Sequence, residues 1–308
     1  MSLKDIKLKI KSVDRTRKVT KAMEAVSAVK MRKSQVRALT GRPYARAALA
    51  VLERLAPSLS TVKHPLTLAR PVKRAAIVVV TSDKGLCGVL NAAAIKEADR
   101  LAKSFALEPK DIDVYTYGKK GAEYFERRGY PLKERFDNVS DDVSLSDLEL
   151  VVYEITNSYQ RGNIDRVDIV YTNFKSTFEQ KALSHQVLPL SLDTISEMVA
   201  DITPDKGAYA TPKATPSGQA PAFYTVEPAP EEVLGTLLPR LTAVVVYHAL
   251  LESKASEHSA RMVAMKNASD KSRDLSKALT RKFNKARQAA ITREVSEIVG
   301  GIEAMASA

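Results

Sequence analysis

Residues 231–302 read EEVLGTLLPRLTAVVVYHALLESKASEHSARMVAMKNASDKSRDLSKALTRKFNKARQAAITREVSEIVGGI, and this segment predicts the architecture of the chain. It contains no glycine between Gly235 and Gly300, and its only proline, Pro239, lies near the start, where a helix tolerates one. Mostly apolar or small side chains recur at alternating intervals of three and four residues, which predicts a long coiled-coil helix. These positions, the seam, are Leu234, Leu237, Leu241, Val244, His248, Leu251, Ala255, His258, Met262, Met265, Ser269, Ser272, Ser276, Leu279, Phe283, Ala286 and Ala290.

A helix of this length exceeds the size of a domain. At about 1.5 Å per residue, some 60 residues form a rod of roughly 90 Å, whereas a compact domain is about 30 Å across. Ser and Ala occupy many seam positions, and small side chains bury little area at roughly 25 cal/mol per Å². We therefore expect that something outside encloses this helix, or that the helix tolerates twisting.

A second long helix is predicted at the N-terminus, over residues 1–56. Residues 3–39 contain neither glycine nor proline, and Leu3, Ile6, Ile10 and Val13 follow the same alternation. Arg17 and Thr20 then stand at seam positions, and the apolar residues beyond them predict a register slip. The slipped positions are Met23, Val26 and Val29.

Composition and charge narrow the class of protein. The 308 residues are 44% hydrophobic, so the chain has enough apolar residues for an ordered core. The single cysteine, Cys87, excludes an internal disulfide framework. We expect a soluble protein, because the N-terminus resembles neither a signal nor a transit leader and no apolar run approaches about 18 residues. The net charge is +12, and residues 1–40 carry twelve Lys or Arg against three acidic residues, which predicts an acidic partner.

The middle of the chain predicts an α/β domain over residues 74–202. Its predicted strands are 75–80, 112–117 and 166–172, with helices over 91–104, 119–128 and 145–159, and Ser144 is a candidate cap for the third helix. Such alternation predicts an open, mostly parallel sheet. Residues 203–230 are proline-rich and predict a linker or extended insert, and the final helix is expected over 231–305.

The search for chemical motifs yields no convincing active site. The loop Thr81–Gly88 lies between a strand and a helix, but it matches neither the P-loop nor G-x-G-x-x-G, and we interpret it as a structural turn rather than a nucleotide site. His248 and His258 lie on the seam, without metal-ligand spacing. Cys87 is interpreted as a small packed residue. The sequence thus predicts no catalytic residue, no cofactor and no metal.

The basic N-terminal helix leaves a nucleic-acid-binding coiled coil open as an alternative, as in the basic region of a zipper protein. Two features oppose it. The cations surround an apolar seam on several faces, and the α/β domain separates this helix from its C-terminal partner.

Several stretches resemble the gamma subunit of F-type ATP synthases, and they span the chain in order. They are SVDRTRKVTKAMEAVSAVKMRKSQVR (12–37), SDKGLCGVLN (82–91), EEVLGTLLPR (231–240), LESKASEHSARMVAMKNA (251–268) and NKARQAAITREVSEI (284–298). The resemblance implies an antiparallel coiled coil of the two terminal helices, with a Rossmann-like α/β domain inserted between them.

The resemblance also implies a function. The helices would form the central-stalk rotor shaft inside a ring of alpha and beta subunits, one copy per complex, with the α/β domain near the epsilon subunit and the membrane c-ring. Ion-driven rotation of that ring would be coupled to ATP synthesis at the alpha/beta sites. The chain itself would be non-catalytic, would bind no nucleic acid and would be peripheral to the membrane, on the cytoplasmic face of a bacterial plasma membrane or, alternatively, on an organellar inner or thylakoid membrane.

Partner contacts follow residue by residue from the same resemblance. Met23 would face the moving acidic segment of beta, and Arg287 and Gln288 would bond to a beta loop, assisted by Thr292. Near the foot, Tyr224 and Glu227 would lie close to epsilon and the ring; these two precede the C-terminal helix.

Overall fold

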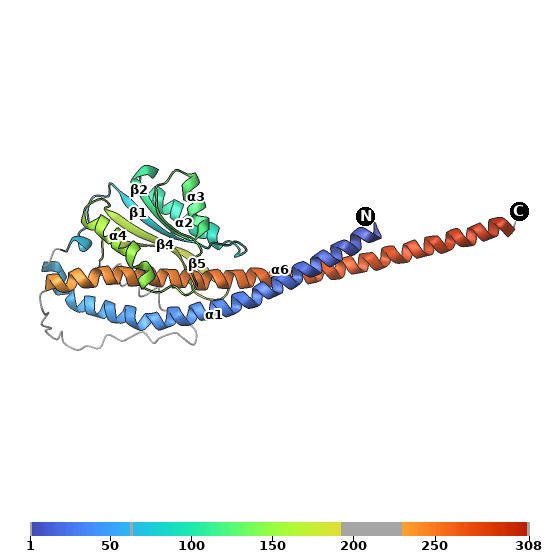
Figure 1. The fold of residues 1–308 in the computed structure, drawn as a ribbon, viewed down its shortest axis with the longest axis horizontal. Coiled ribbons are helices and arrows are strands. Elements are labelled where there is room, and N and C mark those ends of the chain that lie inside the picture. Colours follow the sequence, from blue (N-terminus) through green and yellow to red (C-terminus); the bar gives the residue numbers. More distant parts are fainter. Residues whose placement is uncertain (1, 62–63, 192–229, 307–308) are drawn as a thin grey trace. The chain divides into compact units, whose positions relative to one another are not determined.

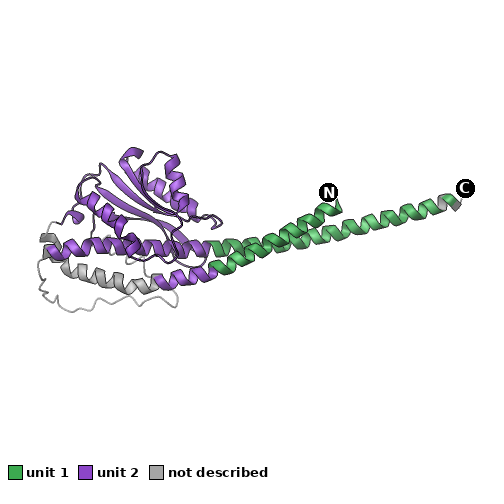
Figure 2. Ribbon diagram, viewed as in Figure 1, with its two compact units in different colours: residues 1–27, 261–308 green, residues 28–260 purple. Residues whose placement is uncertain are grey.

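The structure is a computed structural model of the chain, and it describes residues 2–61, 64–191 and 230–306 (Figure 1). The predicted linker 203–230 lies outside these residues, apart from its last one. The chain divides into two compact units, coloured separately in Figure 2. Unit 1 comprises residues 1–27 and 261–308, and unit 2 comprises residues 28–260.

Two long helices contribute a segment to each unit. Helix α1 spans Leu3–Thr61 and contains 59 residues, and α6 spans Pro230–Ala306 and contains 77. The first helix was expected to end before Pro57, but it continues through that residue to Thr61. A proline inside a helix removes one backbone hydrogen bond without necessarily ending it. Within unit 1 the α1 and α6 segments run side by side in opposite directions (Figure 2).

Unit 2 is built around a five-stranded sheet in the order β3-β2-β1-β4-β5. Its strands are β1 (Ala75–Val80), β2 (Ile112–Tyr117), β3 (Leu132–Phe136), β4 (Arg166–Phe174) and β5 (Gln180–Leu188). Neighbouring strands are parallel except β5, which is antiparallel to β4. The expected open, mostly parallel α/β sheet is confirmed. All six residues of β1 and of β2 are buried, as expected for strands covered on both faces.

Helices cover both faces of this sheet. Helices α2 (Leu90–Ser104) and α3 (Lys119–Arg127) pack on one face, around Ile77, Val79 and Phe125. Helix α4 (Glu149–Gln160) and the first part of α6 pack on the other face. That second core joins Val78 and Tyr115 of the sheet to apolar residues of α6 between Leu234 and Leu250. The long helix therefore supplies part of one covering layer.

Two details of the α/β layer differ from the sequence-based expectation. Strand β3 was missed because its sequence, LKERF, is charged and at most half-buried, as is common for an edge strand. Ser144 does not cap the following helix. Its backbone N–H instead donates to Asp147 Oδ2 at 2.8 Å, and a 3₁₀ turn over Ser146–Leu148 precedes α4.

The predicted seam of α6 is confirmed, because every seam position from Leu234 to Ala290 is buried or half-buried. The predicted slip in α1 is wrong. Val26 and Val29 are 57% and 60% exposed, whereas Thr20 and Ser27 are buried. The alternation of three and four residues thus continues through these small polar side chains. They suit the seam because they allow two helices to approach closely, and the apolar valines are left outside.

One window of α6 is more apolar than the expectation allowed. Within Glu232–Ile302, an 18-residue window has a mean hydropathy of 1.5, which meets the length and composition test for a membrane span. However, 56% of that window is buried inside the protein. Such burial is typical of the core helix of a globular domain, in agreement with the packing of α6 on the sheet.

Candidate functional site

The carboxyl end of the sheet is where open α/β folds usually bind ligands. In unit 2 this place is filled by α6. The space that remains between Thr81, Gly118, Ser253 and Lys254 is about 10 Å³. A single water needs about 10–15 Å³, so no nucleotide fits in this space.

The loop between β1 and α2 is held together by its own side chains and by Asn91 of α2. Asn91 Oδ1 accepts a hydrogen bond from the Ser82 backbone N–H at 2.9 Å, and Asn91 Nδ2 lies 3.3 Å from Cys87 Sγ. Ser82 Oγ donates to the Lys84 carbonyl at 2.6 Å. Cys87 is buried, with 2% of its surface exposed. These contacts support the interpretation of the loop as a structural turn and of Cys87 as a packed residue.

Three of the four histidines, His64, His248 and His258, lie beside protein groups that serve the fold. His64 Nδ1 accepts a hydrogen bond from Leu66 N–H at 3.2 Å, and burial lowers the pKa of this histidine. His248 lies 3.8 Å from Glu252, and His258 lies 2.8 Å from Asp141. Among the described residues, no three His, Cys, Asp or Glu side chains are grouped as metal ligands would be.

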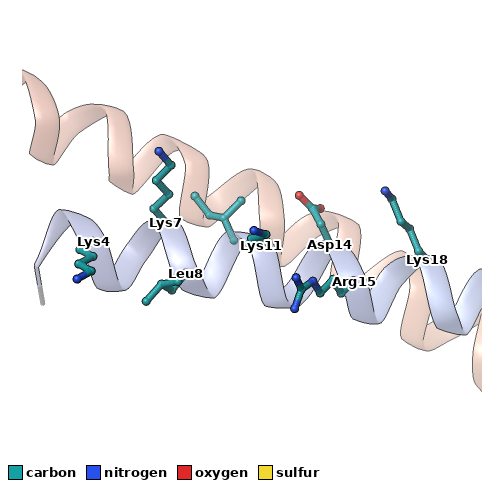
Figure 3. Close-up of a pocket in the computed structure, with 8 residues that line it drawn as sticks. Lys4, Lys7, Leu8, Lys11, Asp14, Arg15 and Lys18 are labelled. Atoms are coloured by element: carbon teal, nitrogen blue, oxygen red, sulfur yellow. The ribbon is translucent and has the colours of Figure 1, made fainter.

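Unit 1 carries a row of cations along successive turns of α1 (Figure 3). They surround an open surface pocket of about 620 Å³, and its lining comes entirely from this one helix. The only acidic residue in the lining is Asp14, whose Oδ1 accepts a hydrogen bond from Ser276 of α6 at 3.0 Å. An open, charged surface of this kind suits an acidic macromolecular partner better than a small ligand. The cations, here called the basic row, are Lys4, Lys7, Lys11, Arg15 and Lys18.

The C-terminal end of α6 presents the predicted partner-contact residues to solvent. Arg287, Gln288 and Thr292 are exposed, and residues 291–302 are all exposed. This segment includes apolar side chains that are 48% to 63% exposed: Ile291, Val295, Ile298, Val299 and Ile302. An uncovered apolar stripe is therefore present at this end of α6.

The remaining predicted contacts do not join this group. Met23 is half-buried on α1 in unit 1, so its side chain contributes to the helix pair as well as to the surface. Tyr224 and Glu227 lie outside the described residues.

Sequence reasoning missed a polar cluster around Asp141 in unit 2. The Asp141 carboxylate lies 2.7 Å from Lys30 of α1 and 2.8 Å from His258 of α6. Hydrogen bonding to His258 and then to Lys30 holds the pKa of Asp141 well below its ordinary value, against the opposing effect of burial. The signal available in the sequence was the polar run from Glu252 to Ser259, which contains Lys254 and His258 and follows the mostly apolar residues 241–251.

Comparison with known proteins agrees with this architecture. A family model described as ATP synthase matches residues 2–305. The ATP synthase gamma chain of Heliobacterium modesticaldum is 38% identical over 303 residues, which cover 98% of this chain and 99% of that protein. The gamma chain of Legionella pneumophila strain Corby is 37% identical over 302 residues, again covering 98% and 99%. Nothing in these comparisons supports the nucleic-acid-binding alternative.

Solved structures share the fold. A chain from the central stalk/c-ring of Tetrahymena thermophila mitochondrial ATP synthase has a TM-score of 0.59 and 28% identity, covering 82% of this chain and 99% of that one. A chain from the Euglena gracilis mitochondrial enzyme, described as OSCP/F1/c-ring, has a TM-score of 0.64 and 18% identity, covering 98% and 94%. Together with the sequence matches over nearly the whole length, this places the chain in the ATP synthase gamma chain family.

Proposed function

We propose that this chain is the central-stalk rotor subunit of an F-type ATP synthase, coupling ion-driven rotation of a c-ring to ATP synthesis. The observation that carries this function is the match to ATP synthase gamma chains over 98% of the chain. The chain is a non-catalytic subunit, and ATP is made at the sites of the alpha/beta ring. The space at the carboxyl end of the sheet is too small for a nucleotide, which agrees with a non-catalytic role for this chain.

The helix pair of unit 1 supplies the shaft. Its seam of small residues keeps the two helices close together, so that they form a thin element suited to turning inside a ring. Its outer surface is uneven, with the basic row on α1 and an apolar stripe at the end of α6. Rotation of an asymmetric surface presents a different contact to each of three surrounding catalytic sites, which can hold them in different conformations.

Particular residues serve this contact in our proposal. Arg287 and Gln288 bond to a loop of beta, with Thr292 beside them, and Met23 faces the acidic segment of beta. The exposure of the three α6 residues supports their role. The basic row provides attraction to acidic surfaces of the ring. Tyr224 and Glu227 contact epsilon and the c-ring near the foot; this assignment rests on the sequence resemblance.

The chain works in a membrane-associated complex, as a peripheral subunit. We propose the cytoplasmic face of a bacterial plasma membrane as its location, because its close relatives include bacterial gamma chains. An organellar inner or thylakoid membrane is the alternative.

Reconstitution tests the function directly. The purified chain is mixed with alpha and beta subunits, and ATPase activity is followed through size-exclusion chromatography. We expect the chain to co-elute with an active complex. Absence of a co-purifying ATPase would overturn the proposal. Salt-sensitive binding of the isolated chain to duplex DNA at physiological ionic strength would instead favour the nucleic-acid alternative.

A further inference from the structure

The end of β4 is held by side chains of α6. Strand β1 pairs with β4 only as far as Val170, so the backbone of β4 beyond that point lacks β1 as a neighbour. There Ser253 Oγ accepts from Thr172 N–H at 2.9 Å, and Glu252 Oε2 accepts from Phe174 N–H at 3.0 Å. Ser256 Oγ donates to the Thr172 carbonyl at 3.0 Å. One face of α6 thus replaces a neighbouring strand.

The same part of α6 is held by the loop of residues 137–145, here called the Asp141 loop. Lys254 Nζ donates to the Val139 carbonyl at 2.9 Å, and His258 Nε2 bonds to Asp141 Oδ1 at 2.8 Å. Because an ionised carboxylate can only accept, Nε2 carries the proton in this bond. The loop therefore contacts α6 at positions 254 and 258, within the segment that β4 also holds.

The Asp141 loop also binds α1. Lys30 Nζ lies 2.7 Å from Asp141 Oδ2, and Arg37 donates to the Asp141 carbonyl oxygen at 2.6 Å and pairs with Asp142. Asp141, which belongs to the α/β domain, therefore bonds to both long helices. The side chains of His258 and Lys254 are only 5% and 11% exposed, so the contacts on α6 are largely shielded from water, whereas Lys30 on α1 is 48% exposed.

We propose that Asp141 is a positioning residue for rotary coupling, and that it fixes the α/β domain to α1 and α6 through Lys30 and His258. This inference rests on the proposed rotor function. In it, rotation imposed on the α/β domain passes to the helices at this joint, which comprises the Asp141 loop and residues 252–259 of α6.

The chemistry of the joint suits the transmission of torque. Apolar contacts are non-directional, so the apolar part of α6 resists separation from the sheet more than it resists sliding. Hydrogen bonds and paired charges weaken steeply when their geometry changes, and they therefore oppose rotation of one element against another. The polar contacts are concentrated where the domain meets both helices, which is where slip would uncouple them.

The test compares ATP hydrolysis with ATP-driven ion pumping in the same membrane vesicles carrying the complete complex. For Asp141→Asn we expect hydrolysis to persist while the ratio of pumping to hydrolysis falls at least about threefold. Asp141→Glu should restore much of the ratio. His258→Leu should lower the ratio, whereas His258→Gln, which keeps a hydrogen-bond donor, should preserve it.

Asp99→Asn is the matched control. Asp99 pairs with Lys103 and Arg128 inside the α/β domain, and its side chain is 16% exposed. An equal ratio of pumping to hydrolysis in Asp141→Asn and in Asp99→Asn would overturn the proposed role of Asp141. Failure of both Asp141→Asn and His258→Leu to assemble would also overturn it, since these residues would then serve folding. If the unsubstituted chain itself gives no coupled complex, the rotor function fails instead.

Discussion

Removal of the Arg287 or Gln288 side chain should impair the assembled ATPase while leaving the chain folded. Both residues are exposed on α6, so Arg287→Ala or Gln288→Ala should change the free energy of unfolding by no more than about 0.5 kcal/mol. In the complex, a hydrogen bond from a charged group contributes about 1.5–3 kcal/mol and a neutral one about 0.5–1.5 kcal/mol. At about 1.4 kcal/mol per factor of ten, ATPase turnover should fall about tenfold or more for Arg287→Ala. For Gln288→Ala the expected fall is about two- to tenfold.

Steady-state ATPase of the purified complex measures the effect, and thermal unfolding of the isolated chain provides the stability comparison. Arg293→Ala is the matched control, because Arg293 is also exposed on α6 and forms a long, 3.9 Å ion pair with Glu297. An exposed ion pair of this kind contributes little to stability, so the control should fold and hydrolyse ATP like the unsubstituted complex. Wild-type turnover in both Arg287→Ala and Gln288→Ala would refute the assignment of these residues to a partner contact.

Three further predictions concern the chain alone. Arg17→Leu should stabilise the helix pair by about 1 kcal/mol, because the half-buried Arg17 stands on the seam; an unchanged melting temperature would contradict that placement. Gly118→Ala should cost more than about 2 kcal/mol, since φ is +96° and a Cβ would lie 2.2 Å from the Thr81 carbonyl oxygen. Gly129→Ala, with φ of +76° but nothing within 4 Å, should cost less in the same denaturant titration. The pKa of Asp141 is depressed from 3.8, so its stabilisation is fully present above that pH and is lost as the pH falls. The stability difference between the unsubstituted chain and Asp141→Asn should therefore shrink between pH 7 and pH 3, and an equal difference at both would argue against the ionised contact.

Much of the fold could be predicted from local pattern. The β-branched run Ala75–Val80 is observed as β1 with the predicted bounds, and the seam of α6 is buried or half-buried throughout. Such elements can be recognised from the sequence because their hydrophobic periodicity matches the geometry of a helix or a buried strand. Strand β3 could not be recognised, because an edge strand with a charged sequence shows little hydrophobic periodicity.

The predicted contact residues could not be found from local pattern, and they rest on family resemblance instead. Arg287, Gln288 and Thr292 came from resemblance to a family, and the structure adds that they are exposed. The predicted register of α1 was wrong because hydrophobicity is not what selects the residues at this helix contact. A pattern scored by hydrophobicity follows Val26 and Val29, whereas close packing of two helices selects the small side chains of Thr20 and Ser27.

The two long helices, the alternating α/β layer and the family could all be inferred from the amino-acid sequence alone. These are properties of neighbouring residues, or of stretches compared one to one, and need no knowledge of what lies opposite. Only the tertiary structure showed that α6 fills the ligand crevice of the sheet and that Asp141 joins Lys30 to His258. Those partners are more than a hundred residues from Asp141 in sequence, and a contact between segments so far apart depends on how the whole domain packs.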